Sequence, residues 1–337
     1  SERRTRMSPA KPVRALALGM LLLGALPTSA RAQSEIQSWV DPTLGQLIPR
    51  AEYGLTYYSG ERVERQPTDL QRTEHSFSLS VPLSQDSRNE WALSANVSLQ
   101  DLDTRAILPD TGGRFPGELW DVRASGSYRH QLDNGWIAGA LLTVGSASDE
   151  PFASEDELYV RAIGMLRVPH RESNAWLFSL IYATDQEILG GFPIPGLAYL
   201  YAPSERFKAV IGFPFTSVEY RPLEPLTLEA QYFPLRRVRA RITYRPFRPL
   251  RFYVGFDWDN DRYFRADRQN KDDKLYYYEK RLTAGARFDL RHVGIRLSGG
   301  YAFDRFYFEG ESYSDRDHNR IDVGSGPFAA VQVSVRF

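Results

Sequence analysis

The chain has 337 residues, enough for one large domain or two ordinary ones, with 13% aromatic and 25% charged residues. The 42 basic side chains balance the 42 acidic ones, which argues against a nucleic-acid-binding protein because such proteins need a basic excess. The absence of cysteine excludes disulfides and thiolate metal sites, and no run of 18 apolar residues could form a transmembrane helix.

Residues 1–32 have the composition of a secretory signal peptide. A basic stretch precedes an apolar run from Ala15 to Leu26, and Ala30-Arg31-Ala32 is an A-x-A cleavage site. The twelve apolar residues are too few to span a bilayer, so an uncleaved anchor is the poorer interpretation. Residues 1–6 precede Met7 and would be an upstream extension. We expect an exported chain, cleaved near Ala32, with a short periplasmic segment over residues 33–45.

From about residue 48 onward, apolar residues recur with a period of two, which indicates β-strands with one apolar face. In the clearest case Trp91, Leu93, Ala95, Val97 and Leu99 alternate with small or polar residues. The pattern predicts an all-β domain over residues 46–337. Its predicted strands cover residues 47–58, 74–84, 89–101, 119–131, 135–146, 157–168, 174–186, 207–221, 226–233, 236–246, 250–258, 274–289, 292–308 and 327–337.

The region from 187 to 221 leaves the strand count open, because prolines interrupt its pattern. The preferred count is about 14 strands, and 16 or 12 are the alternatives. Sixteen follows if 197–202 is a strand and Pro214 marks a tight turn. Otherwise Gly190–Pro203 is a loop, which could fold into the interior as a constriction.

The connections and the tryptophans favour a transmembrane, antiparallel, up-and-down β-barrel over a soluble sandwich. Connections alternate between short and long, as periplasmic turns and extracellular loops do in outer-membrane barrels. Three tryptophans lie beside short turns in the apolar phase, and a fourth begins a strand that follows a long loop. Amphipathic rings are favoured at the headgroup level of a membrane. The predicted aromatic girdle consists of Trp91, Trp120, Trp136 and Trp176.

The C-terminal strand carries the most specific motif, since apolar residues alternate from Ala329 and the sequence ends on an aromatic residue. Together with the signal peptide, this strand resembles the bacterial outer-membrane β-barrel class. Within that class the chain is similar to an uncharacterised barrel family and to no porin family of known substrate. The resemblance implies an outer-membrane location, contact with membrane lipid and lipopolysaccharide, and recognition by the barrel-assembly machinery. The residues that would carry the assembly signal are Val333, Val335 and Phe337.

The polar phase of the C-terminal strands predicts a charged lumen. Acidic residues on neighbouring strands share this phase with many arginines, so cross-strand pairs would neutralise part of the charge. A one-residue shift in register would exchange the lumen and lipid faces. The predicted lumen-lining residues are Glu229, Arg237, Arg239, Arg241, Arg251, Asp257, Arg281, Arg287, Asp289, Arg296 and Arg336.

These residues favour a passive channel for small polar or anionic solutes, without cofactor, metal or nucleic-acid partner. One alternative is a structural or surface-interaction barrel with a plugged lumen. Another is an outer-membrane lipid-modifying enzyme, which the sequence disfavours because none of its 5 histidines lies in a recognised catalytic motif. Asp257, Asp259 and Asp261 are spaced like the start of a calcium loop, but the required glycine and glutamate are absent.

Overall fold

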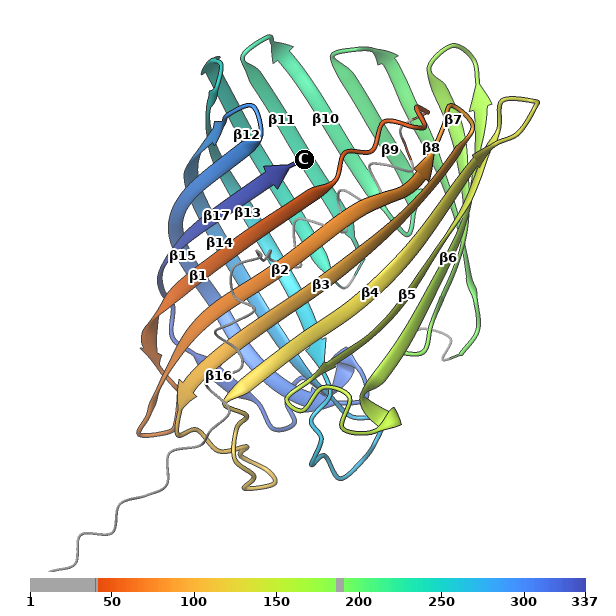
Figure 1. Ribbon diagram of the computed structural model, residues 1–337. Helices are drawn as coiled ribbons and strands as arrows, with labels where there is room; N and C mark the ends of the chain where they lie inside the picture. Colours follow the sequence, from red (N-terminus) through yellow and green to blue (C-terminus); the bar gives the residue numbers. More distant parts are fainter. Residues whose placement is uncertain (1–39, 41, 186–190, 235) are drawn as a thin grey trace, which may run out of the picture.

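In a computed structural model, which describes residues 40, 42–185, 191–234 and 236–337, the chain forms one antiparallel sheet closed into a barrel (Figure 1). β1 (Arg50–Arg62) closes the ring by pairing with β17 (Gly326–Arg336). Of the 17 strands in the sheet, the short β16 (Ile321–Val323) lies outside the ring; it pairs with β15 (Val293–Gly310), and its Val323 also bridges Val63 just after β1. The ring therefore holds sixteen strands. The predicted all-β up-and-down barrel is confirmed, but the preferred count of fourteen is wrong and the alternative of sixteen is right.

The remaining strands follow one another around the barrel in sequence order. Their bounds are β2 (Asp69–Gln85), β3 (Asn89–Thr104), β4 (Glu118–Gln131), β5 (Ile137–Ser148), β6 (Leu158–His170), β7 (Asn174–Ala183), β8 (Ile194–Ser204), β9 (Phe207–Phe213), β10 (Thr216–Leu223), β11 (Leu226–Phe233), β12 (Arg237–Phe247), β13 (Leu250–Tyr263) and β14 (Lys274–Asp289).

The two additional strands come from the proline-interrupted region. The predicted strand 207–221 is two strands, β9 and β10, joined by a turn at Pro214. Proline suits that turn because it has no N–H to donate to a sheet. Residues 194–204 form β8, which pairs with β7 on one side and β9 on the other. The alternative of a loop folded inward over Gly190–Pro203 is therefore wrong, since most of this segment lies in the wall.

The alternation separates an apolar outer surface from a polar interior. On β3, Trp91 and Leu93 are exposed. Asn96, Ser98 and Gln100, which lie farther along the same strand in the opposite phase, are buried. Such an outward apolar face with a polar inside is the arrangement of a transmembrane barrel. Within the described part of the chain, no helix is long and apolar enough to cross a membrane.

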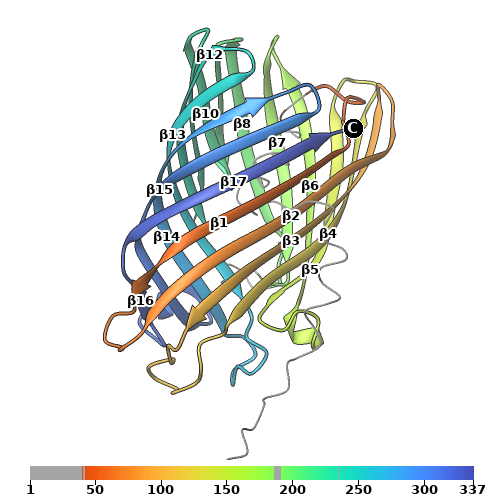
Figure 2. The ribbon, with the colours of Figure 1, turned by 60° about the vertical axis from the view of Figure 1, so that its left-hand side comes forward.

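The barrel has two different ends, which we call the turn end and the loop end. At the turn end the strands join through short turns and the C-terminus lies there (Figures 1 and 2). At the loop end the connections are longer, and β2, β3, β14 and β15 extend far along the axis, with 16 to 18 residues each. On the other side of the ring β9, β10 and β11 have only 7 or 8 residues. The wall is therefore much taller on one side than on the other.

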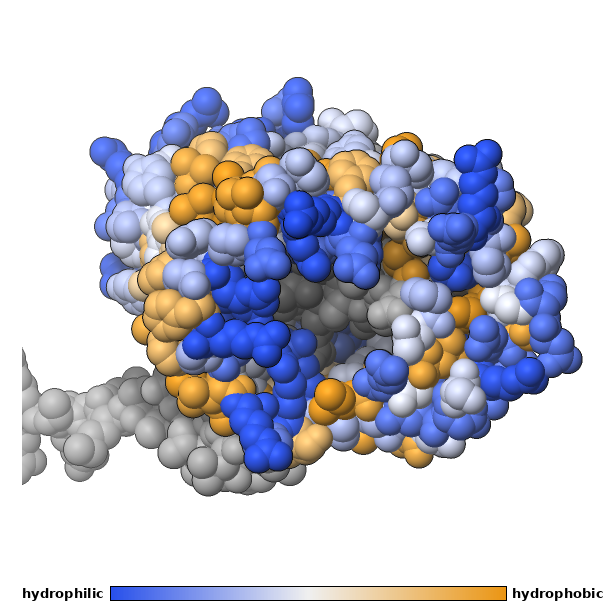
Figure 3. Space-filling view, turned by 90° about the horizontal axis from the view of Figure 1, so that it is seen from above, coloured by the Kyte–Doolittle hydropathy of each residue, from blue (hydrophilic) through white to orange (hydrophobic). Residues whose placement is uncertain are grey.

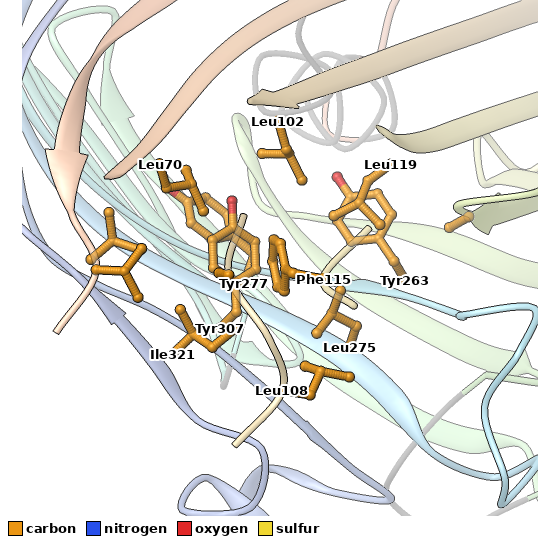
Figure 4. Packing of buried hydrophobic residues seen from close by; sticks show 14 of the residues in the cluster. Leu70, Leu102, Leu108, Phe115, Leu119, Tyr263, Leu275, Tyr277, Tyr307 and Ile321 are labelled. Carbon is orange, nitrogen blue, oxygen red and sulfur yellow. The ribbon is translucent and has the colours of Figure 1, made fainter. Parts of the chain in front are cut away.

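The loop end is closed by contacts across the barrel. The end of β13 reaches β5, which lies eight strands away in the ring of sixteen, and Phe264 N–H donates to Ala147 O at 2.7 Å. Asp149 N–H in turn donates to Phe264 O at 3.3 Å. Figure 4 shows the apolar cluster beside this contact, with Phe115 and Leu108 of the 105–117 loop turned inward against side chains of β13, β14 and β15. The lumen is filled at this end, whereas Figure 3 shows the turn end, where hydrophilic and hydrophobic side chains both border a central hollow.

Candidate functional site

The predicted lumen residues lie on the inward phase of β11 to β15 and β17. The strand register aligns them in rows: Gln231, Arg239, Asp257 and Arg281 lie side by side on four consecutive strands. A second row, nearer the turn end, contains Arg251, Arg287 and Arg296. The register thus brings most of the predicted charges onto one wall. Their role in passing a solute stays a prediction.

In the middle of this wall the arginines are paired with aspartates. Arg239 donates to Asp257 at 2.6 Å, and Arg237 donates to Asp259 at 2.5 Å. Arg281 also reaches Asp259, at 2.7 Å. These side chains therefore neutralise one another across neighbouring strands, as the sequence pattern predicted for the wall in general. Asp259 was considered only as a metal ligand in the sequence, and the structure shows it as an ion-pair partner instead.

Closer to the loop end, Glu279 of β14 binds two arginines from distant parts of the chain. Arg72 of β2 donates to both carboxylate oxygens, at 3.0 and 3.1 Å, and Arg305 of β15 approaches to 3.3 Å. All three side chains are only about 1% exposed. Tyr58 donates to the same carboxylate at 3.1 Å, and its ring lies 3.8 Å from the Arg72 guanidinium.

We call Tyr58, Arg72, Glu279 and Arg305 the loop-end cluster. Alternation along single strands places these residues on the inner face, but it cannot indicate that they meet. Arg72 and Glu279 are 207 residues apart in the sequence, and their strands are separated in the ring by β1, β17 and β15. Sequence reasoning therefore missed the cluster. Its only signal was the presence of charged residues in the same phase near the ends of long strands.

At the turn end, one carboxylate serves several arginines. Asp289 lies 2.6 Å from Arg251, 2.8 Å from Arg287 and 3.8 Å from Arg336. Arg251 and Arg336 are 40% and 43% exposed, so water reaches these ion pairs. Positive charge exceeds negative charge in this part of the wall.

Two further arginines of the wall have no acidic partner. Arg241 of β12 and Arg296 of β15 form no ion pair with any described residue. Their guanidinium carbons lie 4.7 and 5.7 Å from the ring centre of Tyr253 on β13. Glu229, a predicted lumen residue, is directly opposite Arg241 on β11, but the two side chains do not come within ion-pair distance. The expected cross-strand neutralisation is therefore incomplete here.

The facing part of the lumen is mainly apolar. Inward residues of β7, β8 and β9 form a cluster that includes Leu177, Leu200 and Val210, and Val40 packs against it. Beside this cluster is a small pocket that is also lined by Lys208 and Glu229. Residues 42–49 contact the inner wall as well, where Gly45 N–H donates to Glu90 at 3.1 Å. The lumen thus has one charged wall and one apolar wall.

The predicted girdle and assembly residues face outward. Trp91, Trp136 and Trp176 are 49%, 36% and 39% exposed beside the turn end, and Trp120 lies near the loop end. Val333 and Val335 occupy the outward phase of β17, and Phe337 follows this strand as an exposed side chain. Contact of the tryptophans with lipid headgroups and recognition of this strand by an assembly machinery stay predictions.

The predicted cleavage site at Ala32 and the signal peptide lie outside the described residues. The described residues contain no group of three or more His, Asp or Glu side chains that could hold a metal ion. Whether the chain catalyses a reaction on lipid stays open in the structure.

No protein-family model and no curated protein matches the chain. Among solved structures, the chain is similar to the beta domain of the Bordetella autotransporter Brka, at 12% identity and a TM-score of 0.33, over 86% of this chain and 99% of that one. It is similar to an outer membrane channel from Pseudomonas putida F1, at 10% identity and a TM-score of 0.38, over 88% and 98%. It is also similar to the Pseudomonas putida toluene transporter TodX, at 10% identity and a TM-score of 0.36, over 87% and 90%.

Proposed function

We propose that this protein is an outer-membrane channel for the passive passage of small anionic solutes, in a conformation closed at the loop end. The apolar outward face, the alternation of short and long connections and the C-terminal aromatic strand support the location. In that orientation the turn end faces the periplasm and the loop end faces the exterior. Membrane lipid and lipopolysaccharide surround the barrel, and no cofactor is required.

The observation that carries the proposal is the surplus of positive charge on the turn-end wall. Asp289 is shared by three arginines, and Arg241 and Arg296 form no ion pair with a carboxylate of the described residues. A cleft lined by one sign of charge raises the local concentration of solutes with the opposite charge. Rings of arginine are a known basis for anion selectivity in pores.

Single-channel conductance in a planar bilayer, with a KCl gradient across it, tests the proposal. We expect discrete steps and a reversal potential that shows anion preference. Because Arg241→Glu with Arg296→Glu replaces the two unpaired charges, this double variant should lose the preference. The matched control is Arg88→Glu with Arg171→Glu, which makes the same change in net charge on exposed turns. Folded protein that gives no steps under any condition would contradict a channel.

A second function, a closed barrel with a structural or surface-interaction role, is favoured by the packing at the loop end. The cross-barrel hydrogen bonds of Phe264 and the side chains of the loop-end cluster fill the lumen at the loop end. A channel must displace the 105–117 loop or these contacts, whereas a structural barrel need not. Conductance that stays absent after the loop is loosened would favour this second function. The lipid-modifying enzyme has no observation in its favour among the described residues.

A further inference from the structure

Arg241 and Arg296 differ from the other arginines of the wall because their charge is not matched within the chain. Neither makes an ion pair with a described residue, and the Nε atom of each is buried without a hydrogen-bond partner. Glu229 is directly opposite Arg241 on β11 but does not come within ion-pair distance of it, and Asp257, the next carboxylate along this wall, is bound by Arg239 at 2.6 Å. Both side chains are half-buried, and a buried N–H group without a partner is costly, so these two arginines can gain hydrogen bonds from a solute that enters the lumen.

The fold holds these two guanidinium groups around one aromatic ring. Arg241 lies on β12, next to β13, and Arg296 lies on β15, beyond β14; their guanidinium carbons are 4.7 and 5.7 Å from the centre of the Tyr253 ring. A ring in this position favours cations electrostatically, which fixes the two side chains without neutralising them. The two guanidinium groups are therefore held in place before a solute binds. The Nε–H group of each has no hydrogen-bond partner.

Small residues next to the ring provide the space for this arrangement. A Cβ atom on Gly285 would lie 2.7 Å from the Tyr253 hydroxyl oxygen, so only glycine lets the ring lie against β14. The neighbouring inward positions are also small, and the register aligns Gly255, Thr283 and Gly300 in one row on β13, β14 and β15. The Arg241 side chain lies beside Gly255, and the Phe328 ring covers Gly300, so the small residues let these larger side chains pack against the wall.

We propose that Arg241, Tyr253 and Arg296 form a binding site for small organic dicarboxylates. Guanidinium groups bind carboxylates through two parallel N–H···O bonds, so each arginine can take one carboxylate of the same solute. The site adds a substrate class to the proposed channel function. It rests on that function only because the solute must reach the site through the lumen. It assigns the substrate class as dicarboxylates in preference to monocarboxylates.

Isothermal titration of the refolded full-length protein in a non-ionic detergent at low ionic strength tests the site without requiring conduction. The probes are succinate and, as the matched monocarboxylate, butyrate. We expect succinate to bind about tenfold more tightly than butyrate, because butyrate forms one charge-assisted pair where succinate forms two. Arg241→Gln and Arg296→Gln should each weaken succinate binding by about tenfold while leaving butyrate binding less affected.

Two further variants separate a built site from general attraction to a positive wall. Arg296→Lys keeps the charge but loses the bidentate geometry, so it should bind succinate as weakly as Arg296→Gln. Arg251→Gln removes an exposed arginine while Asp289 keeps Arg287, and it should change succinate binding by less than about twofold. Equal weakening by Arg251→Gln and Arg296→Gln would overturn the proposal, as would rescue by lysine or the absence of succinate binding to folded wild-type protein.

The titration and the conductance experiment fail independently. If the protein conducts anions but binds succinate no better than butyrate, the channel stands and the dicarboxylate site is wrong. If it binds succinate through both arginines but gives no conductance steps, the site stands and the open-channel function is wrong.

Discussion

The loop end and the turn end of the lumen both contain arginines gathered around a single carboxylate, but only the loop-end group is shielded from water. At the loop end Arg72, Glu279 and Arg305 are almost completely buried and are packed against tyrosine rings. At the turn end Asp289 holds arginines that are up to 43% exposed. Arginines around a carboxylate are therefore shielded from water at the loop end and are reached by water at the turn end.

This difference decides what each group of charges can do. An exposed ion pair contributes little to stability because water competes with it, so its members can exchange partners with a solute at low cost. A buried pair is different, because removal of one partner leaves a charge with neither water nor a counter-ion. We therefore interpret the loop-end cluster as part of the structure of the barrel and the turn-end arginines as the part available to solutes.

The largest effect is expected from Glu279→Gln, which would leave Arg72 and Arg305 buried without their shared carboxylate. Breaking a buried pair costs about 3–5 kcal/mol. We expect a fall of this size in the free energy of unfolding, which urea titration in detergent micelles would measure. The matched substitution at the turn end, Asp289→Asn, should cost about 1 kcal/mol or less. Similar losses in the two variants would contradict the distinction between a dry end and a wet end.

The barrel and its faces could be predicted from sequence, because strand alternation is a local property. Trp91 and Leu93 on one face and Asn96 and Ser98 on the other follow directly from a period of two. The strand count depended on Pro214, which lies in the turn between β9 and β10. This turn is so short that, in the sequence, it looks the same as an irregularity within one long strand. Local patterns contain too little information to decide such a case.

The candidate site was only half predictable for a related reason. The alternation placed Arg241 and Arg296 on the inner face, but it could not show that they meet at Tyr253, because each lies on a different strand. The ion pair of Arg72 with Glu279 was out of reach for the same reason, since it depends on how the ring closes and where it narrows. Contacts across a lumen arise from tertiary structure and leave no periodic signal in the chain.

A second effect, which is seen in conductance and proteolysis, is expected from loosening the apolar part of the loop end. Leu108 and Phe115 turn the 105–117 loop into the lumen and are both buried (Figure 4). Leu108→Ala with Phe115→Ala removes packing worth roughly 2–5 kcal/mol at each position, most of which acts on the position of this loop. We expect a higher probability of open steps in planar bilayers and faster cleavage of the loop by protease.

The control for this pair is Ile107→Ala, which changes an exposed residue of the same loop. It should leave the conductance and the rate of cleavage unchanged. If the double variant is cleaved faster but still gives no steps, the loop is not what closes the channel, and the closed structural barrel becomes the better interpretation.

The most local effect concerns an ion pair between two loops at the loop end. Glu157 accepts from Arg268 at 3.0 Å, which connects the β5–β6 loop to the β13–β14 loop, and both side chains are buried. Burial by itself would raise the pKa of the Glu157 carboxyl, but hydrogen bonds from Ser154 and Arg268 outweigh it and hold this pKa below its usual value. The pair therefore stabilises the closed loops at neutral pH, and this contribution is lost as the pH falls through the lowered pKa.

A spin label on Ala153→Cys would report this loss, since the chain has no other cysteine and Ala153 is exposed. The label should be immobile at pH 7 and become mobile only when the pH falls below the usual range of a glutamate, where the carboxylate with its lowered pKa takes up a proton. Glu157→Gln should make the label mobile at both pH values and remove the pH dependence. A label that becomes mobile on acidification even in Glu157→Gln would assign the change to other carboxylates of the loop end. In that case the Glu157–Arg268 pair would be a consequence of loop closure rather than one of its causes.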